Sequence, residues 1–338
     1  MIAILLAAAL VPPGVDGALA IEDASGLRAF FTAAGRYAAS VSPESIGRSL
    51  RNRVGVDLLA DRPGWGLGRG TRIIAVLRGG TGLSAPLADV KAAHAALDAW
   101  RRAGPPDRVG RISGKRLLTA SGRGSVDLLK ALAHPQPLPP PLATAAGGKA
   151  WVYVRMTEPL RVSVLQIDAS AQGLGARGIV TASAPILAGR APAGCDGGPS
   201  ACVRAGLAPA GRGAMEIALQ RLRMPPQPDL RTASRVEERL DEIDARRLDA
   251  LAPRVVIDGR ESADGPALAG HLDLAQVAAA LARLTPLDAL SGPWPAGAYA
   301  AHLVYGPLLR NAGPLTLTGD SLPSSKDAAQ VELRLPLR

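Results

Sequence analysis

The feature that most constrains the fold is a strand followed by an aspartate-capped helix, and it is clearest in residues 71–133. Residues 72–77 (RIIAVL) form an apolar, β-branched run that ends at two glycines, which is typical of a buried strand. Asp89 precedes VKAAHAALDAW, where its carboxylate can accept the free N–H groups of a first helical turn. The unit predicts a strand, a helix, two short strands within 108–120 and a second helix from Ser125.

The same arrangement recurs at two other places in the chain. Asp23 separates a short apolar segment from an Ala-rich helical pattern in residues 17–36, and Asp273 does the same in residues 269–284. We interpret Asp23, Asp89 and Asp273 as helix caps. The three segments together indicate an internal duplication.

A proline-rich stretch divides the chain into two parts. Residues 135–148 (PQPLPPPLATAAGG) are typical of a stiff, polyproline-like connector that packs poorly as helix or strand. Residues 15–134 are therefore predicted to form a first α+β lobe and residues 149–338 a second. The hydrophobic content of 47% is enough for a sizeable core. We expect mixed or mainly antiparallel sheets with helices on one side, arranged as two similar lobes.

Strand patterns dominate the second part. Three successive antiparallel strands are predicted between residues 149 and 184, and a terminal hairpin is predicted over residues 315–337. Residues 231–251 give the most regular helical pattern, with Ser234 and Glu237 as a capping box. Its apolar stripe indicates a helix that covers its own core, or one that binds a partner.

The N-terminus and the cysteines bear on the compartment. Residues 1–14 (MIAILLAAALVPPG) hold an apolar run too short for a transmembrane helix, which needs about 20 residues. We read it as a signal peptide of a periplasmic protein or as a first buried strand, with cytoplasmic location as the alternative; residues 18–20 (ALA) resemble a cleavage site. Cys195 and Cys202 bracket a turn-forming loop and are predicted to form a disulfide, with two free buried thiols as the alternative.

Charge and aromatic content argue against nucleic-acid binding. The chain has 39 Lys and Arg against 29 Asp and Glu, a net charge of +10, but the basic residues are dispersed along it. Aromatic residues make up 3% of the chain, so few side chains could stack on bases. The charge remains compatible with an anionic partner.

Two glycine-rich matches to nucleotide-binding motifs fail in their context. Residues 173–178 (GLGARG) precede a β-type run, whereas a dinucleotide fingerprint must open a helix. In residues 110–115 the glycine spacing is too short for a phosphate loop, and Arg116 replaces the Ser or Thr that binds the metal. No cofactor is predicted.

Histidines offer one weak constellation. His271 and Asp273 are two positions apart, and with His302 they could form a hydrolytic or metal site. A helix cap already accounts for Asp273, however. The cysteines lack the partners of a zinc site, so no metal is predicted.

The segments VPPGVDGALAIEDASGLRAFF, APLADVKAAHAALDAW and GRISGKRLLTASG resemble the repeated strand and helix units of uncharacterised bacterial envelope proteins classed as domains of unknown function. The resemblance covers residues 12–190 and the C-terminal repeat. It implies export and an α+β fold, and it carries over no active residues.

The leading hypothesis is a non-catalytic envelope protein that binds a hydrophobic or anionic partner or serves as a scaffold. The alternatives are the histidine-based hydrolase or metal enzyme and an intracellular adaptor using helix 231–251.

Overall fold

The structure is a computed structural model of the 338-residue chain. It describes residues 9–37, 42–60, 64–156, 158–170, 172–188, 201–209, 254–256, 268–273 and 313–337. The helices are α1 (Ala24–Tyr37), α2 (Pro43–Val54), α3 (Val90–Arg102), α4 (Ser125–Ala133) and α5 (Pro140–Ala143). The strands are β1 (Leu10–Val11), β2 (Gly17–Ile21), β3 (Arg72–Leu77), β4 (Gly80–Pro86), β5 (Val109–Ser113), β6 (Arg116–Ser121), β7 (Gln136–Pro137), β8 (Ala150–Arg155), β9 (Leu160–Ser170), β10 (Gly173–Ala182), β11 (Ala201–Ala205), β12 (Arg254–Val256), β13 (Leu268–Asp273), β14 (Pro314–Leu322) and β15 (Ser325–Pro336).

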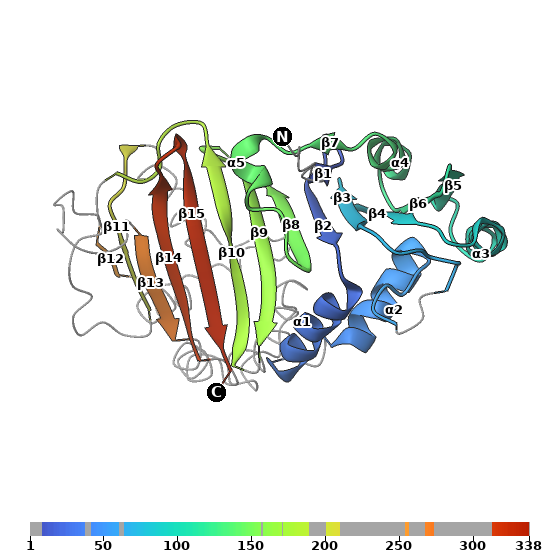
Figure 1. Cartoon of the computed structure of the whole chain (residues 1–338), viewed down its shortest axis with the longest axis horizontal. Helices are drawn as coiled ribbons and strands as arrows, with labels where there is room; N and C mark the ends of the chain where they lie inside the picture. The colour runs from blue at the N-terminus through green and yellow to red at the C-terminus, as the bar shows by residue number, and fades with distance from the viewer. Residues whose placement is uncertain are drawn as a thin grey trace, which may run out of the picture.

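One long sheet organises the described part of the chain (Figure 1). Its 13 strands follow the order β12-β11-β13-β14-β15-β10-β9-β8-β2-β3-β4-β6-β5. All named strand pairs are antiparallel except β11 with β12. The predicted α+β class with a mainly antiparallel sheet is therefore confirmed.

Helices cover both faces of the N-terminal part of this sheet, which corrects the expectation of helices on one side. Successive strand residues point to opposite faces. Ile73 packs in the cluster that contains the buried residues of α4 and α5, and Ile74 packs in the cluster of α1, α2 and α3. Ala20 and Ile21 of β2 divide in the same way. Because both faces are apolar here, both need a cover. We call them the α4 face and the α1 face.

Strand β4 is absent from the sequence-based prediction. Its sequence, GTGLSAP, begins with glycines that we read as the end of the preceding strand. Gly80 to Ala85 are nevertheless buried, and β4 pairs with both β3 and β6. The glycines serve close packing, because a Cβ on Gly82 would lie 2.7 Å from a methyl carbon of Leu132 in α4. The central unit is thus strand, strand, helix, strand, strand, helix.

The proline-rich segment is part of the core, which corrects its reading as a connector that packs poorly. It contains β7, which pairs with β1, and the short helix α5. Leu138, Leu142 and Ala145 are buried in the same cluster as α4. The sheet is also continuous between the two halves of the chain, since β2, before the proline-rich segment, pairs with β8, after it. The duplication of two similar lobes stays a prediction.

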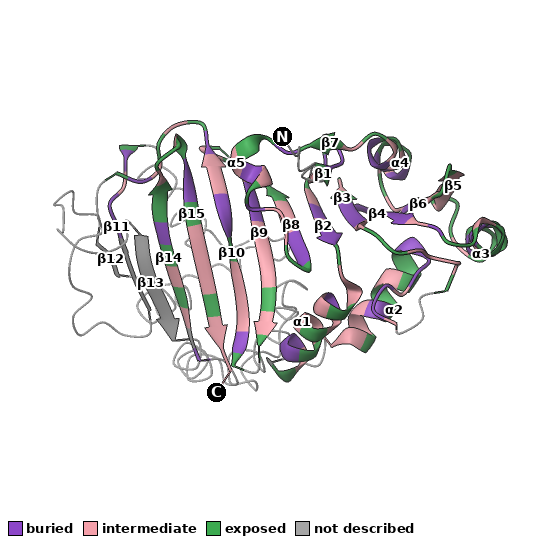
Figure 2. Cartoon of the chain, viewed as in Figure 1, coloured by how far each residue is buried: buried purple, intermediate pink, exposed green. Residues whose placement is uncertain are grey.

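The second half contains the predicted strands wherever it is described. Strands β8, β9 and β10 are successive and antiparallel, and β14 and β15 form the terminal hairpin. The two glycine-rich matches lie in strands: residues 110–115 span the β5–β6 hairpin, and residues 173–178 lie in β10. Figure 2 shows that β9, β10 and β15 are mostly half-buried along their length.

Candidate functional site

The α1 face stays apolar along the strands of the second half, where α1 contacts β9 and β10. A row of cross-strand neighbours runs from Leu19 through Val152, Leu165 and Gly178 to Val331. The four side chains in this row are half-buried. The opposite face of the same strands carries the polar residues Gln166, Asp168, Arg177, Gln330, Glu332 and Arg334, together with the buried Trp151, Val164, Ile179 and Ala328 of the α4 cluster. The strands β8, β9, β10 and β15 therefore present one largely apolar face and one face on which polar residues alternate with residues of the α4 cluster.

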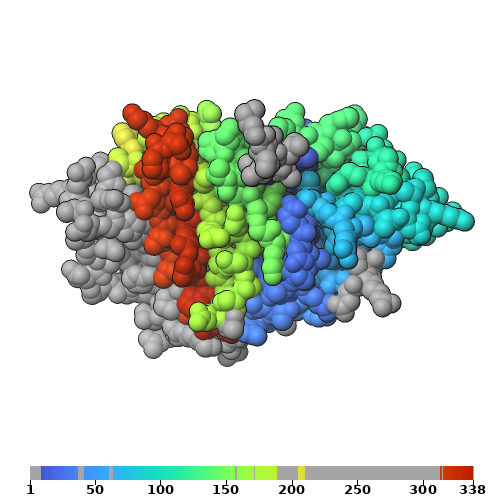
Figure 3. All heavy atoms as spheres, in the orientation of Figure 1, coloured from blue at the N-terminus to red at the C-terminus, as the bar shows by residue number. Residues whose placement is uncertain are grey.

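Figure 3 shows the face that carries α5. The atoms of β14, β15, β9 and β10 lie open on this side, with no helix over most of their length. Its polar side chains are compatible with water. The apolar α1 face is covered in part by α1, and its exposed valines Val76 and Val154 favour a further apolar partner.

Among the sheet residues whose burial is described, the most exposed valines lie in the next row of the α1 face. Val76 of β3 and Val154 of β8 are both Cα partners of Gly17 in β2. Their exposed fractions are 40% and 39%, and Met156 just beyond β8 is 37% exposed. Gly17 leaves a gap between the valines, because the position of a Cβ there would meet only the backbone oxygen of Tyr153, at 3.4 Å. We call this row of Val76, Gly17 and Val154 the trough, because the apolar surface dips at Gly17 between the two exposed valines.

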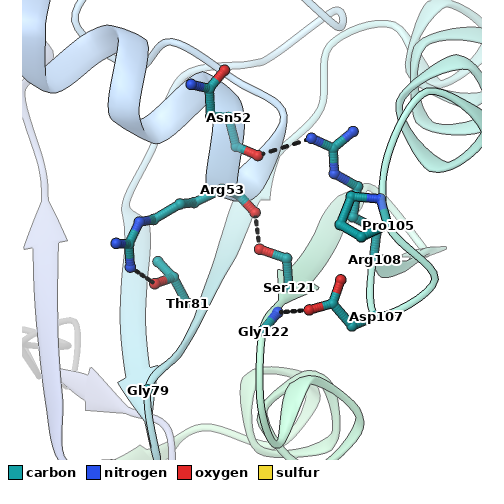
Figure 4. A pocket seen from close by; sticks show the side chains of 9 residues that line it. All are labelled: Asn52, Arg53, Gly79, Thr81, Pro105, Asp107, Arg108, Ser121 and Gly122. Atoms are coloured by element: carbon teal, nitrogen blue, oxygen red, sulfur yellow. Dashed lines mark hydrogen bonds between the residues drawn. The ribbon is translucent and has the colours of Figure 1, made fainter.

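A polar pocket lies beside this trough (Figure 4). Thr81 of β4 is the Cα partner of Val76, and Arg53 Nη1 donates to Thr81 Oγ1 at 3.3 Å. The cavity has a volume of about 220 Å³. It is lined by Asn52, Arg53, Gly79, Thr81, Pro105, Asp107, Arg108, Ser121 and Gly122.

The end of α2 explains why these polar side chains converge. The last carbonyl groups of a helix have no partner within the helix. Here side chains from β6 and from the segment after α3 supply the donors. The bonds run from Arg108 Nη2 to Asn52 O (3.1 Å), from Ser121 Oγ to Arg53 O, and from Thr119 Oγ1 to Val54 O (2.8 Å). The pocket is thus built around a helix terminus that faces the sheet.

Aromatic packing holds Arg108 in place. Its guanidinium carbon lies 5.0 Å from the centroid of the Trp100 ring, and Nη1 donates to the Trp100 carbonyl oxygen at 2.9 Å. Trp65 contacts Trp100 edge to face, with ring centroids 6.1 Å apart. A cation over an aromatic face is favourable, so this guanidinium is fixed at the rim of the pocket.

Shifted pKa values occur outside the pocket. Burial lowers the pKa of Arg72 and of Arg116, whose guanidinium groups are about half buried. Burial also raises the pKa of Tyr153, and Arg155 opposes this shift. Hydrogen bonds from Ser25 lower the pKa of Asp23. These shifts follow from packing and capping.

The structure places two of the three predicted caps at helix starts. Asp89 is the N-cap of α3, and its Oδ1 accepts from Ala92 N at 2.9 Å. Asp23 precedes α1 and accepts from Ser25 N and Ser25 Oγ at 2.9 and 2.7 Å. Asp273 is the last residue of β13, and the helix predicted after it lies outside the described residues.

The remaining predicted residues are only partly described. His271 lies in β13 as the Cα partner of Cys202 in β11, whereas His302 and Cys195 lie outside the described residues. The same holds for residues 231–251. The disulfide, the histidine constellation and the adaptor helix all stay predictions.

The cleavage-like residues 18–20 lie inside β2, between β3 and β8. A cut after Ala20 would remove a central strand. Export therefore remains a prediction that needs another cleavage point.

Sequence reasoning missed the pocket and the trough. Arg53 and Arg108 are separated by more than fifty positions, and no motif joins them. The valine row has a weak signal in the sequence. In both RIIAVL and WVYVR, the apolar residues at alternate positions continue beyond the part of the strand that the core buries. Gly17 lies between these valines only in the folded sheet, so the sequence around Gly17 does not indicate that they are its neighbours.

Comparisons with known proteins identify no family. No family model matches the chain, and no curated protein matches it significantly. Two solved structures, crystal forms I and III of TP0453, are 12% and 10% identical to it, each with a TM-score of 0.29. They cover 51% of this chain and 79% and 78% of their own. Similarity at this level indicates neither a family nor an activity.

Within the part of the chain that the structure describes, no helix is long and apolar enough to cross a membrane. Those residues also contain no group of three or more potential metal ligands.

Proposed function

We propose that this chain is a non-catalytic binding protein of the bacterial cell envelope, which holds a hydrophobic partner against the α1 face of its sheet. The observation that carries the proposal is the row of half-buried apolar side chains from Leu19 to Val331, together with the exposed valines Val76 and Val154 beside it. Apolar surface that stays in water is unfavourable by about 25 cal/mol per Å², so a hydrophobic partner gains by covering it.

The polar groups of the described pocket support binding in preference to catalysis. Arg108, Ser121 and Asp107 are engaged in hydrogen bonds that hold the end of α2 and the loop before β5. A catalytic site would instead direct a nucleophile or a general base into the cavity. The envelope location is supported by the N-terminal apolar run and by the resemblance of the strand and helix units.

The experiment compares two neighbouring residues of β9 that point to opposite faces. Leu165→Asn places an amide on the apolar face beside Val152, and Gln166→Asn is the matched control on the opposite face. Binding of the neutral dye Nile red and of dodecanol is measured for both variants, and thermal unfolding reports whether each folds. We expect Leu165→Asn to weaken binding several-fold and Gln166→Asn to leave it unchanged. Equal binding by both variants, or no binding by the unmodified protein, would contradict the proposal.

A further inference from the structure

The pocket and the apolar trough adjoin each other on the α1 face. Thr81, which accepts the hydrogen bond from Arg53, is the Cα partner of Val76 at one end of the trough. The trough then crosses β2 at Gly17 and ends at Val154. A cationic group and an exposed apolar strip are therefore continuous on one surface.

The pocket carries an excess of positive charge. Among the described residues, neither Arg53 nor Arg108 lies within ion-pair distance of a carboxylate. The carboxylate of Asp107 accepts from Gly122 N at 2.9 Å, and Asp16 beside β2 accepts from Arg78 N at 2.7 Å. The pocket lining therefore carries two guanidinium groups against the one carboxylate of Asp107, and Arg53 makes its only side-chain hydrogen bond within the described residues to a neutral hydroxyl.

We propose that the partner is a single-chain amphiphile with an anionic head group. This proposal rests on the function proposed above. The head group binds at Arg53, with the positive charge of Arg108 at the rim of the pocket, and the alkyl chain lies along Val76, Gly17 and Val154. Guanidinium groups bind carboxylate and phosphate oxygens through strong, charge-assisted hydrogen bonds. From β4 to β8 the path crosses three strand spacings, about 14 Å, which accommodates an extended alkyl chain.

The pocket favours one free amphiphile over a membrane surface. Its cationic groups line a cavity of about 220 Å³ beside the exposed valines, which limits the site to one head group. An interfacial membrane site instead buries a broad apolar face flanked by many basic side chains.

The experiment uses three probes that share a twelve-carbon chain and differ in charge: dodecanoate, dodecanol and dodecyltrimethylammonium, each kept below its micelle concentration. Calorimetry gives the dissociation constant for the full-length protein. We expect dodecanoate to bind about tenfold or more tightly than dodecanol, and the cationic probe to bind weakest. Arg53→Gln should remove most of the preference for dodecanoate. Arg48→Gln, an equal loss of charge on an exposed part of α2 outside the pocket, should not.

The trough itself is tested by filling it. Gly17→Leu should weaken dodecanoate and dodecanol alike, and Val154→Ser provides the same test if the leucine variant does not fold. Equal affinity for all three probes, unchanged by Arg53→Gln, would overturn the head-group site and leave the hydrophobic binding protein standing. Failure of every alkyl probe to bind would overturn that function as well. Binding of anionic phospholipid vesicles without binding of monomeric dodecanoate would identify a membrane surface instead and refute the single-chain ligand.

Discussion

Asp89 and Asp23 hold the starts of α3 and α1 by different hydrogen bonds. Asp89 accepts the backbone N–H of Ala92, three residues on, as an N-cap side chain does. Asp23 directs both carboxylate oxygens to one residue, Ser25, through its N–H and its hydroxyl. The similar sequence pattern therefore leads to two different sets of hydrogen bonds at the helix starts, and each set gives its own prediction.

Removing the N-cap carboxylate of α3 should destabilise the fold. We expect Asp89→Ala to lower the free energy of unfolding by about 0.5–2 kcal/mol, because the N–H of Ala92 loses its acceptor. Urea denaturation measures the change. Asp98→Ala is the matched control, since Asp98 is exposed in the interior of the same helix and caps nothing. An equal effect of both substitutions would show that the cap contributes nothing specific.

The hydroxyl of Ser25 should control the titration of Asp23. Its hydrogen bond is the largest contribution that lowers the Asp23 pKa below the usual value of 3.8. Because the pKa is lower in the folded state, this carboxylate stabilises the fold above its unfolded pKa, and the contribution is lost as pH falls through the folded pKa. Ser25→Ala should raise the Asp23 pKa in an NMR titration. Thr32→Ala, which removes a hydroxyl elsewhere in α1, should leave the pKa in place.

At the scale of elements, β4 is a strand that the periodicity of apolar residues cannot predict. The alternation of RIIAVL predicted β3, and the apolar stripe of Ala93, Leu97 and Trp100 predicted α3 together with its buried side. Strand β4 has neither feature, because Gly80 and Gly82 weaken its pattern. Its place depends on partners distant in sequence, namely β6 and α4.

The approach of α4 to β4 should tolerate no side chain at Gly82. A Cβ there would lie 2.7 Å from Leu132 Cδ1 and 3.0 Å from Leu128 Cδ2. We expect Gly82→Ala to lower the free energy of unfolding by about 1–3 kcal/mol, since the helix must shift away from the sheet. Gly64→Ala is the control, because a Cβ on Gly64 has no neighbour within 4 Å. Equal stability of both variants in chemical denaturation would show that α4 accommodates the methyl group freely.

At the scale of the whole molecule, residues 135–148 tie the two halves of the sheet together. Leu142 of α5 is 4% exposed and packs in the cluster that also contains Trp151 of β8 and Leu128 of α4. We expect Leu142→Ala to cost about 2–5 kcal/mol of stability. Leu10→Ala in the neighbouring β1, where the side chain is 39% exposed, should cost much less. Similar small losses for both would show that the proline-rich segment behaves as a loose linker.

Composition led to the misreading of this segment, and distance along the chain hid the binding surface. Prolines remove backbone donors and favour extended conformations, so PQPLPPPLATAAGG gives no helix or strand period, and only its leucines mark contact with the core. The pocket and trough combine β2, β3, β4, β8 and the end of α2. Individual strands were predictable from alternation, but their order in the sheet was not, and that order sets which side chains become neighbours.

The central claim is that the α1 face binds a hydrophobic ligand, and methyl NMR tests it most directly. Protein with labelled Val and Leu methyl groups is titrated with monomeric dodecanol. The account predicts that saturating shifts concentrate at Val76, Val154, Val152 and Leu165 on the α1 face, while Val162 on the opposite face changes little. Shifts confined to Val162 and the α4 cluster, or no saturable shifts at all, would contradict it.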